Sequence, residues 1–216
     1  MFNYNIKELY DFISEKMSHI LASDIQYNWE EFENCLGQGI SRSAFYYPEF
    51  PDIVFKLDIG EDGVGCEDFF GKEMEVYTEA KEYGLSQFFA PMAYIGTIQM
   101  DYADDRVDEY GENYEEIIQV SVEVYIQQKV DTTWSGKRAS GEINVRELEH
   151  EIRTVEKLNV TEISWIPDLS AYFLKRYGEE TYCELSELID QCGLDDLHGG
   201  NWGFIDDDLI LIDYAM

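Results

Sequence analysis

The sequence predicts an α+β fold in which a sheet-rich part is followed by a mainly helical part. Short β-branched and aromatic runs, separated by glycine and proline, dominate residues 31–130 and are typical of antiparallel strands. Apolar residues recur at helical steps in residues 131–216. Strands followed by helices indicate the α+β class, as one domain or two closely packed lobes. Since 45% of the 216 residues are hydrophobic, the chain can bury a substantial core.

Residues 1–30 are predicted to form a helical extension before the sheet. Apolar residues recur there at three- and four-residue steps with charged residues between them, as in an amphipathic helix. These positions are Ile6, Leu9, Tyr10, Ile13, Met17 and Ile20. The following stretch FENCLGQGISRSAFYYPEFPDIVFKLD, residues 32–58, reads as three strands joined by a glycine turn and a proline-bounded turn. It predicts a three-stranded antiparallel meander.

A helix and two more strands are expected next. Residues 69–84, FFGKEMEVYTEAKEYG, predict a helix that ends at Gly84. The expected buried face consists of Phe70, Met74 and Tyr77, with Lys81 as an optional fourth position. Residues 88–102 and 117–130 predict two strands, and the acidic stretch between them, ADDRVDEYGENYEE, is expected to be their connection.

The remaining third of the chain predicts helices and one hairpin. Val145, Leu148, Ile152, Val155 and Leu158 recur at helical steps. Residues 167–193 predict one long helix, or two with a break at Gly178, that end at Gly193. A short two-stranded hairpin then leads to the apolar run LILI and a final aspartate.

The charge balance excludes several classes of partner. Asp and Glu number 46 against 15 Lys and Arg, which gives a formal net charge of -31 and a pI near 4.1. Such a surface repels nucleic-acid phosphates and anionic membranes. The favoured interpretation is a solvated surface that keeps the protein soluble and monomeric. The alternative is a surface that imitates DNA and occupies a DNA-binding protein.

Cysteine and histidine usage predicts a cytoplasmic protein without a zinc site. Cys35, Cys66, Cys183 and Cys192 contain no C-x-x-C pair, and no signal peptide or membrane-spanning apolar run is recognisable. The three histidines show no metal-ligand spacing.

Two features of the sheet part carry chemistry. Gly37 and Gly39 form a G-x-G turn. By itself this turn is weak evidence for a ligand site, because such turns also join strands in proteins without a ligand. Lys56 is more informative, because a lysine within an apolar strand has to reach solvent or be paired where it lies. Glu73 or Glu75 of the following helix could pair with it, and Glu75 is preferred.

The stretch DDLHGGNWGFIDDDLILIDYAM contains the strongest signal. Asp196 and Asn201 are five residues apart, and Asp213 follows Asn201 by twelve residues at the end of an apolar run. A carboxylate near an attacking hydroxyl, together with an amide oxygen and a carboxylate on Mg²⁺, supplies the parts needed for phosphoryl transfer.

This ordered set resembles the protein-kinase-like superfamily over residues 32–216. It is most similar to the aminoglycoside-phosphotransferase-like branch, through Asp196, His198 and Asn201 as D-x-H-x-x-N, and to small kinase-like proteins of bacteria and phages. The resemblance implies a sheet lobe with one helix and a reduced helical lobe. It implies that ATP and Mg²⁺ bind, and that residues 124–130, VYIQQKV, form the hinge that holds adenine.

The resemblance also implies a role for each residue. Gly37 and Gly39 would cover the nucleotide phosphates, and Lys56, held by Glu75, would contact them. The catalytic base would be Asp196, and the Mg²⁺ ligands would be Asn201 and Asp213. His198 would support the loop as a buried histidine bonded to backbone.

Three departures from the family pattern are visible. Arg42 replaces the third glycine and could cap a phosphate or block the pocket. Leu194 stands where a histidine usually precedes the catalytic aspartate, and the terminal triplet is DYA. Only three residues follow Asp213, so the substrate-binding helices of the family are missing from this sequence.

Three functions are therefore open for this sequence. The first is a minimal phosphotransferase that borrows an acceptor platform from a partner protein or modifies a small molecule. The second is a pseudokinase that acts as a binding module. The third is an acidic DNA mimic of phage or plasmid type, directed against a DNA-binding protein and built on a kinase-like scaffold.

Overall fold

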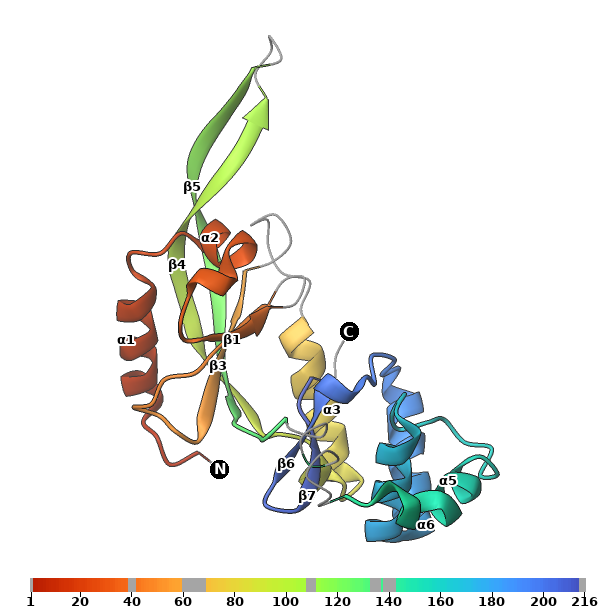
Figure 1. The fold of residues 1–216 in the computed structure, drawn as a ribbon. Helices are drawn as coiled ribbons and strands as arrows, with labels where there is room; N and C mark the ends of the chain where they lie inside the picture. The colour runs from red at the N-terminus through yellow and green to blue at the C-terminus, as the bar shows by residue number, and fades with distance from the viewer. Residues whose placement is uncertain are drawn as a thin grey trace. The chain divides into compact units, whose positions relative to one another are not determined.

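The computed structural model describes residues 2–38, 42–59, 69–107, 112–132, 137 and 143–213. The chain divides into two compact units, each of which is discontinuous in sequence. The sheet unit comprises Met1–Asp68 and Pro91–Lys129, and the helical unit comprises Phe69–Ala90 and Val130–Met216. The α+β class with an antiparallel sheet, predicted from the sequence, is confirmed (Figure 1).

The sheet unit contains a five-stranded antiparallel sheet in the order β1-β2-β3-β5-β4. The predicted meander is confirmed, because β2 pairs with both β1 and β3 in antiparallel register. The strands are β1 (Cys35–Gln38), β2 (Arg42–Phe45), β3 (Ile53–Asp58), β4 (Met92–Val107) and β5 (Asn113–Gln128).

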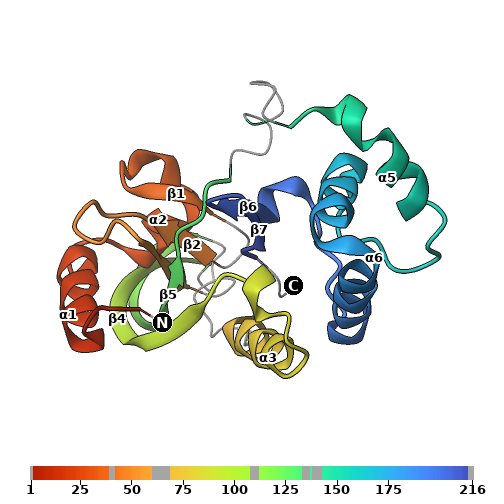
Figure 2. The same cartoon turned by 90° about the horizontal axis from the view of Figure 1, so that it is seen from below.

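Two helices at the N-terminus complete this unit. Helix α1 (Ile6–Met17) starts at Asn5, whose side chain accepts a bond from the Lys7 N–H, and buries Leu9 and Met17. Helix α2 (Ala22–Tyr27) and a 3₁₀ turn (Trp29–Glu31) follow. Both α1 and α2 contact β4, and Figure 2 shows α1 beside that strand. The predicted amphipathic helix is therefore confirmed, and it packs into the core of the sheet unit, although Ile6 of its expected apolar face is 54% exposed.

The acidic stretch between β4 and β5 differs from the prediction. It was expected to be a connection, but residues 103–107 and 113–116 belong to the strands. The ladder continues without interruption from Gly96 paired with Val124 to Val107 paired with Asn113. Backbone pairing with a neighbour already in register overrides the weak strand propensity of Asp and Glu. The two strands form a ribbon that projects beyond the rest of the sheet (Figure 1).

The helical unit is built around one long helix and a hairpin. Gly178, at φ 87° and ψ 169°, breaks α6 (Pro167–Cys192) in two, which is one of the two alternatives expected from the sequence. Gly193, at φ 65°, caps its end as predicted. The other elements are α3 (Phe69–Glu82), 3₁₀ turns at Ser86–Phe88 and Val145–Leu148, α5 (Glu149–Val155), a 3₁₀ turn at Gly199–Asn201, β6 (Trp202–Ile205) and β7 (Asp208–Leu211).

The buried face of α3 was predicted incorrectly. Glu73, Val76 and Ala80 are buried, whereas Met74 and Tyr77 are half-buried and Lys81 is exposed. The side chain of Phe70 lies outside the described part of the structure. The prediction followed the large apolar side chains, but the face is centred on small residues and one glutamate.

Two hydrogen bonds tie α3 and Tyr83, the residue that follows it, to the second half of α6. The Cys192 thiol donates to Glu79 Oε2 at 3.0 Å, and the Tyr83 hydroxyl donates to Gln191 Oε1 at 2.8 Å. Burial, reinforced by this bond to Glu79, raises the pKa of Cys192 to about 12, so the thiol stays protonated as a donor. These bonds fix the helices at one end of the unit.

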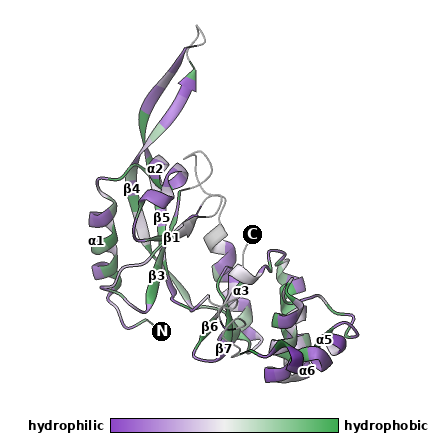
Figure 3. Ribbon diagram, viewed as in Figure 1, coloured by the Kyte–Doolittle hydropathy of each residue, from purple (hydrophilic) through white to green (hydrophobic). Residues whose placement is uncertain are grey.

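Each unit has its own hydrophobic core. One cluster gathers α1, α2 and the sheet, and the other gathers α3, α6 and the hairpin β6–β7. Figure 3 shows the apolar positions alternating with polar ones along the strands and helices. Within the described residues, no helix is both long enough and apolar enough to cross a membrane.

Candidate functional site

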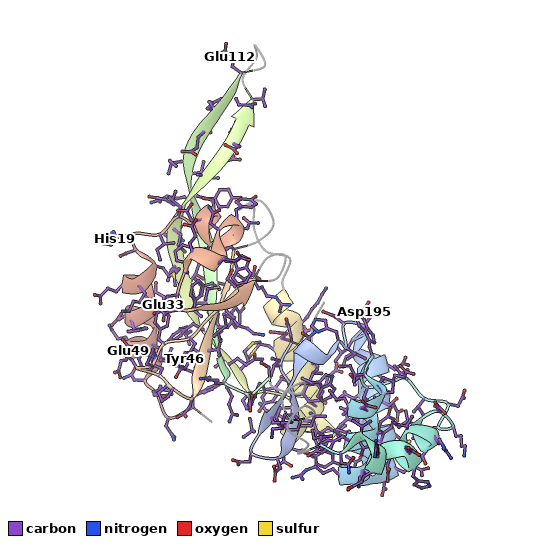
Figure 4. All side chains as sticks on the ribbon, viewed as in Figure 1. His19, Glu33, Tyr46, Glu49, Glu112 and Asp195 are labelled. Carbon is purple, nitrogen blue, oxygen red and sulfur yellow. The ribbon has the colours of Figure 1, made fainter. Side chains whose placement is uncertain are left out.

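The loop between α6 and β6 carries the predicted catalytic residues. Figure 4 labels Asp195, which is exposed where the loop leaves α6, and Asp196 follows it. His198 begins the 3₁₀ turn at Gly199–Asn201, and its Nδ1 accepts a bond from the Gly200 N–H at 3.0 Å. The opposite ring nitrogen lies 3.5 Å from Asp196 Oδ2. Since Nδ1 accepts, the ring proton lies on Nε2 and faces that carboxylate.

Asn201 links the other two residues predicted for phosphoryl transfer, Asp196 and Asp213. Its side chain is buried, and its Nδ2 donates to the Asp196 backbone carbonyl at 2.7 Å and to Asp196 Oδ2 at 3.2 Å. Its own backbone carbonyl accepts the N–H of Ile212 at 2.9 Å. Ile212 directly precedes Asp213, so the structure brings Asp196, Asn201 and Asp213 to the same end of the hairpin.

The hairpin that presents Asp213 is held by its neighbours on both sides. β6 and β7 pair from Trp202 opposite Leu211 to Ile205 opposite Asp208. Phe204 exchanges two backbone bonds with Asp131, at 2.7 and 2.9 Å. Along β7, the Leu211 carbonyl accepts the Ala90 N–H at 2.8 Å, and the fully buried Trp202 fills the centre. The position of Asp213 is therefore set by backbone bonds on both strands.

The turn of the hairpin is tied to the first half of α6. Arg176 donates through Nε and Nη2 to Asp208 Oδ1, at 3.2 and 3.0 Å, and the Tyr177 hydroxyl donates to the same oxygen at 3.0 Å. The bond from Arg176, followed by that from Tyr177, lowers the pKa of Asp208. Arg176 and Tyr177 were not predicted as partners of Asp208, because about thirty residues separate them from it in the sequence.

An exposed aromatic residue adjoins the loop and was also missed. The backbone N–H of Trp165 donates to the Leu197 carbonyl at 3.0 Å, and the ring centroid of Trp165 lies 6.1 Å from that of His198. The Trp165 side chain is 59% exposed, and that of His198 is 47% exposed. The prediction that His198 bonds to backbone is confirmed, but its burial was predicted wrongly, because the ring covers the outside of the loop.

In the sheet unit, Lys56 lies on the sheet face opposite the core cluster. It sits in β3 between Ala44 of β2 and Tyr125 of β5, and it is only 9% exposed. Two residues further along the same face, the buried Asp58 stands opposite Arg42. The predicted lysine is therefore buried in a polar stripe of the sheet. Asp58 is a member of this stripe that the sequence pattern did not single out.

The glycine turn is described at one of its two predicted positions. At Gly37, an added Cβ would meet no described atom within 4 Å, so packing among the described residues does not require glycine there. Gly39 lies outside the described residues. A glycine that packing does not require is compatible with a ligand that approaches the backbone closely.

The two candidate partners of Lys56 occupy different surroundings on α3. Glu73 is fully buried and Glu75 is exposed. Both belong to the helical unit, whereas Lys56 belongs to the sheet unit. The expected pairing of Lys56 with Glu75 therefore stays a prediction.

The donor atoms around Asn201 suit a hard divalent cation. Because Nδ2 points at Asp196, Oδ1 is the amide atom left for a ligand, and Asp213 adds carboxylate oxygens. Among the described residues, no group of three or more His, Cys, Asp or Glu could hold a metal by itself. Mg²⁺ that binds together with a nucleotide typically has few protein ligands, and phosphate and water oxygens complete its coordination. One amide oxygen and one carboxylate would fit such a ligand set.

Comparison of the chain with protein-family models, with curated proteins and with solved structures gives no match.

Proposed function

We propose that this chain is a kinase-like protein that binds Mg²⁺ and ATP and transfers the terminal phosphoryl group. One observation carries the proposal, namely the bonds through which Asn201 joins Asp196 to the end of the hairpin that bears Asp213. These bonds bring a base candidate and two oxygen ligands together, which is what catalysis by positioning and charge neutralisation requires.

The proposed chemistry assigns one step to each residue. Asp196 accepts the proton of an acceptor hydroxyl, whose oxygen forms a bond to the terminal phosphorus as the bond to the nucleoside diphosphate breaks. Asn201 and Asp213 would hold Mg²⁺, which neutralises charge on the phosphate oxygens. The amide of Asn201 and the ring of His198 both face Asp196 and hold its carboxylate in one orientation.

The sheet unit supplies independent support. Lys56 lies in a central strand and is only 9% exposed, at the position where the resemblance implies a lysine that contacts the phosphates. The order of elements, with a glycine turn, a lysine strand, a helix, two strands and then the loop of Asp196, also follows the order of the family that the sequence resembles. Lys56 and Gly37 are proposed to contact the phosphates, and Glu75 is kept as the carboxylate that orients Lys56.

Thermal unfolding with and without Mg²⁺ and ATP tests the proposal. A ligand at about a hundred times its dissociation constant stabilises the folded state by roughly 2.7 kcal/mol. For a chain of this size we expect the wild-type midpoint to rise by roughly 5 to 10 °C. Asp213→Asn should abolish this shift, because it removes a charged ligand of the cation while keeping the shape of the side chain.

The matched control is Asp206→Asn, in the turn of the same hairpin. Asp206 is exposed and has φ 55°, a conformation that asparagine tolerates well. Its variant should keep the full shift. No shift in the wild type, or an equal loss in both variants, would show that the Asn201 end of the hairpin is not a nucleotide site.

Substitution of Gly37 separates packing from ligand binding. An added methyl group meets no described atom within 4 Å. Gly37→Ala should therefore change the free energy of unfolding of the ligand-free protein by less than about 1 kcal/mol. It should reduce the shift caused by Mg²⁺ and ATP, because the methyl group obstructs close approach of the phosphates. Titration of the shift against ATP concentration measures the loss, and an unchanged titration would remove Gly37 from the site.

A further inference from the structure

The ribbon formed by β4 and β5 carries charge that the fold does not need. We define the acidic arm as residues 101–107 of β4 and 113–119 of β5, which project beyond the other strands (Figure 1). Residues 101–119 contain eight Asp or Glu and one Arg, about twice the acidic density of the whole chain. Figure 4 labels Glu112 at the tip of the arm. This segment is therefore denser in acidic residues than the chain as a whole.

Like charges face each other directly across the arm. Asp104 pairs with Glu116, and Asp105 pairs with Glu115. Like charges at directly opposed positions destabilise a β-ladder. Arg106 relieves the first pair, since it bonds Asp104 at 2.8 Å and Glu116 at 3.1 Å.

The second pair has no such relief. Asp105 and Glu115 are exposed and point to the other face of the ribbon, where the described structure provides no basic side chain within ion-pair distance of either. Folding alone does not explain this arrangement, because it weakens the ribbon. A cation from another molecule would remove the repulsion.

The same face also exposes apolar side chains. By strand alternation, Asp105 and Glu115 share their face with Asp101, Ala103, Val107 and Ile117. The side chains of Ile117 and Val107 are 52% and 64% exposed. We call this surface the Ile117 face. Along it, carboxylates alternate with apolar residues.

We propose that the Ile117 face docks a basic segment of another protein, in which lysine or arginine alternates with apolar residues. Charge complementarity selects this occupant. A second copy of the arm would bring Asp105 and Glu115 against the same charges, and nucleic acids and anionic membranes are repelled. The apolar residues between the acids add contact area that a diffuse acidic surface lacks. This docking surface is independent of the proposed nucleotide site.

Fluorescence anisotropy with two labelled peptides tests the proposal on the full chain. One peptide alternates lysine and valine, and the other contains the same number of lysines without valine. The arm variant is Asp101→Asn, Asp105→Asn and Glu115→Gln. The control variant, Glu30→Gln, Glu33→Gln and Glu49→Gln, removes the same charge from exposed positions of the same unit.

We expect the arm variant to bind the alternating peptide about fivefold to thirtyfold more weakly, as the loss of three surface ion pairs predicts. The control variant should change the affinity less than about twofold, and high salt should abolish the difference between the variants. The folded arm should persist in the arm variant, because its changes remove repulsion, and circular dichroism checks this.

Ile117→Ser tests the apolar part of the surface. It should weaken binding of the alternating peptide and leave binding of the pure lysine peptide unchanged, since only the first peptide offers an apolar contact. Equal weakening by the arm and control variants would show diffuse attraction to a generally acidic surface. That result would overturn the proposal, as would failure of the wild type to bind either peptide.

Discussion

Asp196→Ala is expected to lower phosphoryl transfer by about two to four orders of magnitude, which is the usual contribution of a general base. Binding of Mg²⁺ and ATP should stay nearly intact. The variant removes a carboxylate that accepts from Asn201 Nδ2, but the backbone carbonyl of residue 196 still accepts from the same atom at 2.7 Å. The loop should therefore keep its shape while it loses its base.

Release of labelled phosphate from ATP, with water as the acceptor, measures the transfer without knowledge of the natural acceptor. Thermal unfolding with Mg²⁺ and ATP measures binding in the same samples. Asp195→Ala is the control. Asp195 is the exposed neighbour of Asp196, and its substitution removes the same charge from the same loop. If Asp196→Ala loses binding and transfer together, or retains full transfer, Asp196 is not the base.

Gly203→Ala should destabilise the helical unit by about 2 to 3 kcal/mol, as is typical of an extra methyl group in a well-packed position. A Cβ at this position would lie 2.8 Å from both the Asp131 carbonyl oxygen and Val130 Cγ2. That carbonyl already accepts the Phe204 N–H at 2.7 Å, so the hairpin cannot move away without breaking the bond. Thermal unfolding should show a midpoint roughly 4 to 12 °C lower.

Gly200→Ala provides the contrast for this prediction. Its added Cβ would meet only the ring of His198, at 2.8 Å from Cε1, and an exposed side chain can rotate away. The cost should be about 1 kcal/mol, the value of the bond that His198 loses. If both alanine variants unfold at the same temperature, the backbone contact of Gly203 with Asp131 does not hold the hairpin.

Local sequence patterns predicted much of the fold. The meander, the break at Gly178 and the cap at Gly193 are confirmed, because turns and helix ends depend on a few neighbouring residues. The grouping of Asp196 and Asn201 with Asp213 was also predictable. A tight loop and one hairpin separate these residues, so their distance is set within about eighteen positions of the chain.

The errors arose where distant segments decide the structure. The face of α3 follows its packing partners, so the buried Glu73 was not distinguishable from Glu75 by spacing. The acidic arm was expected to be a loop, because strand propensity ignores the partner strand already in register. The ring of His198 lies beside that of Trp165, which is more than thirty residues away in the sequence. None of these features has a local signal.

The discontinuity of the two units has a consequence for synthesis of the chain. The N–H of Ala90 bonds to the carbonyl of Leu211, so the segment that contains α3 finds its strand partner about 120 residues later. At about 5 to 20 residues per second, this delay is roughly 6 to 24 s. The sheet unit has all of its segments once Lys129 has emerged. It can therefore fold on the ribosome, while the helical unit must wait until the hairpin β6–β7 is outside the exit tunnel.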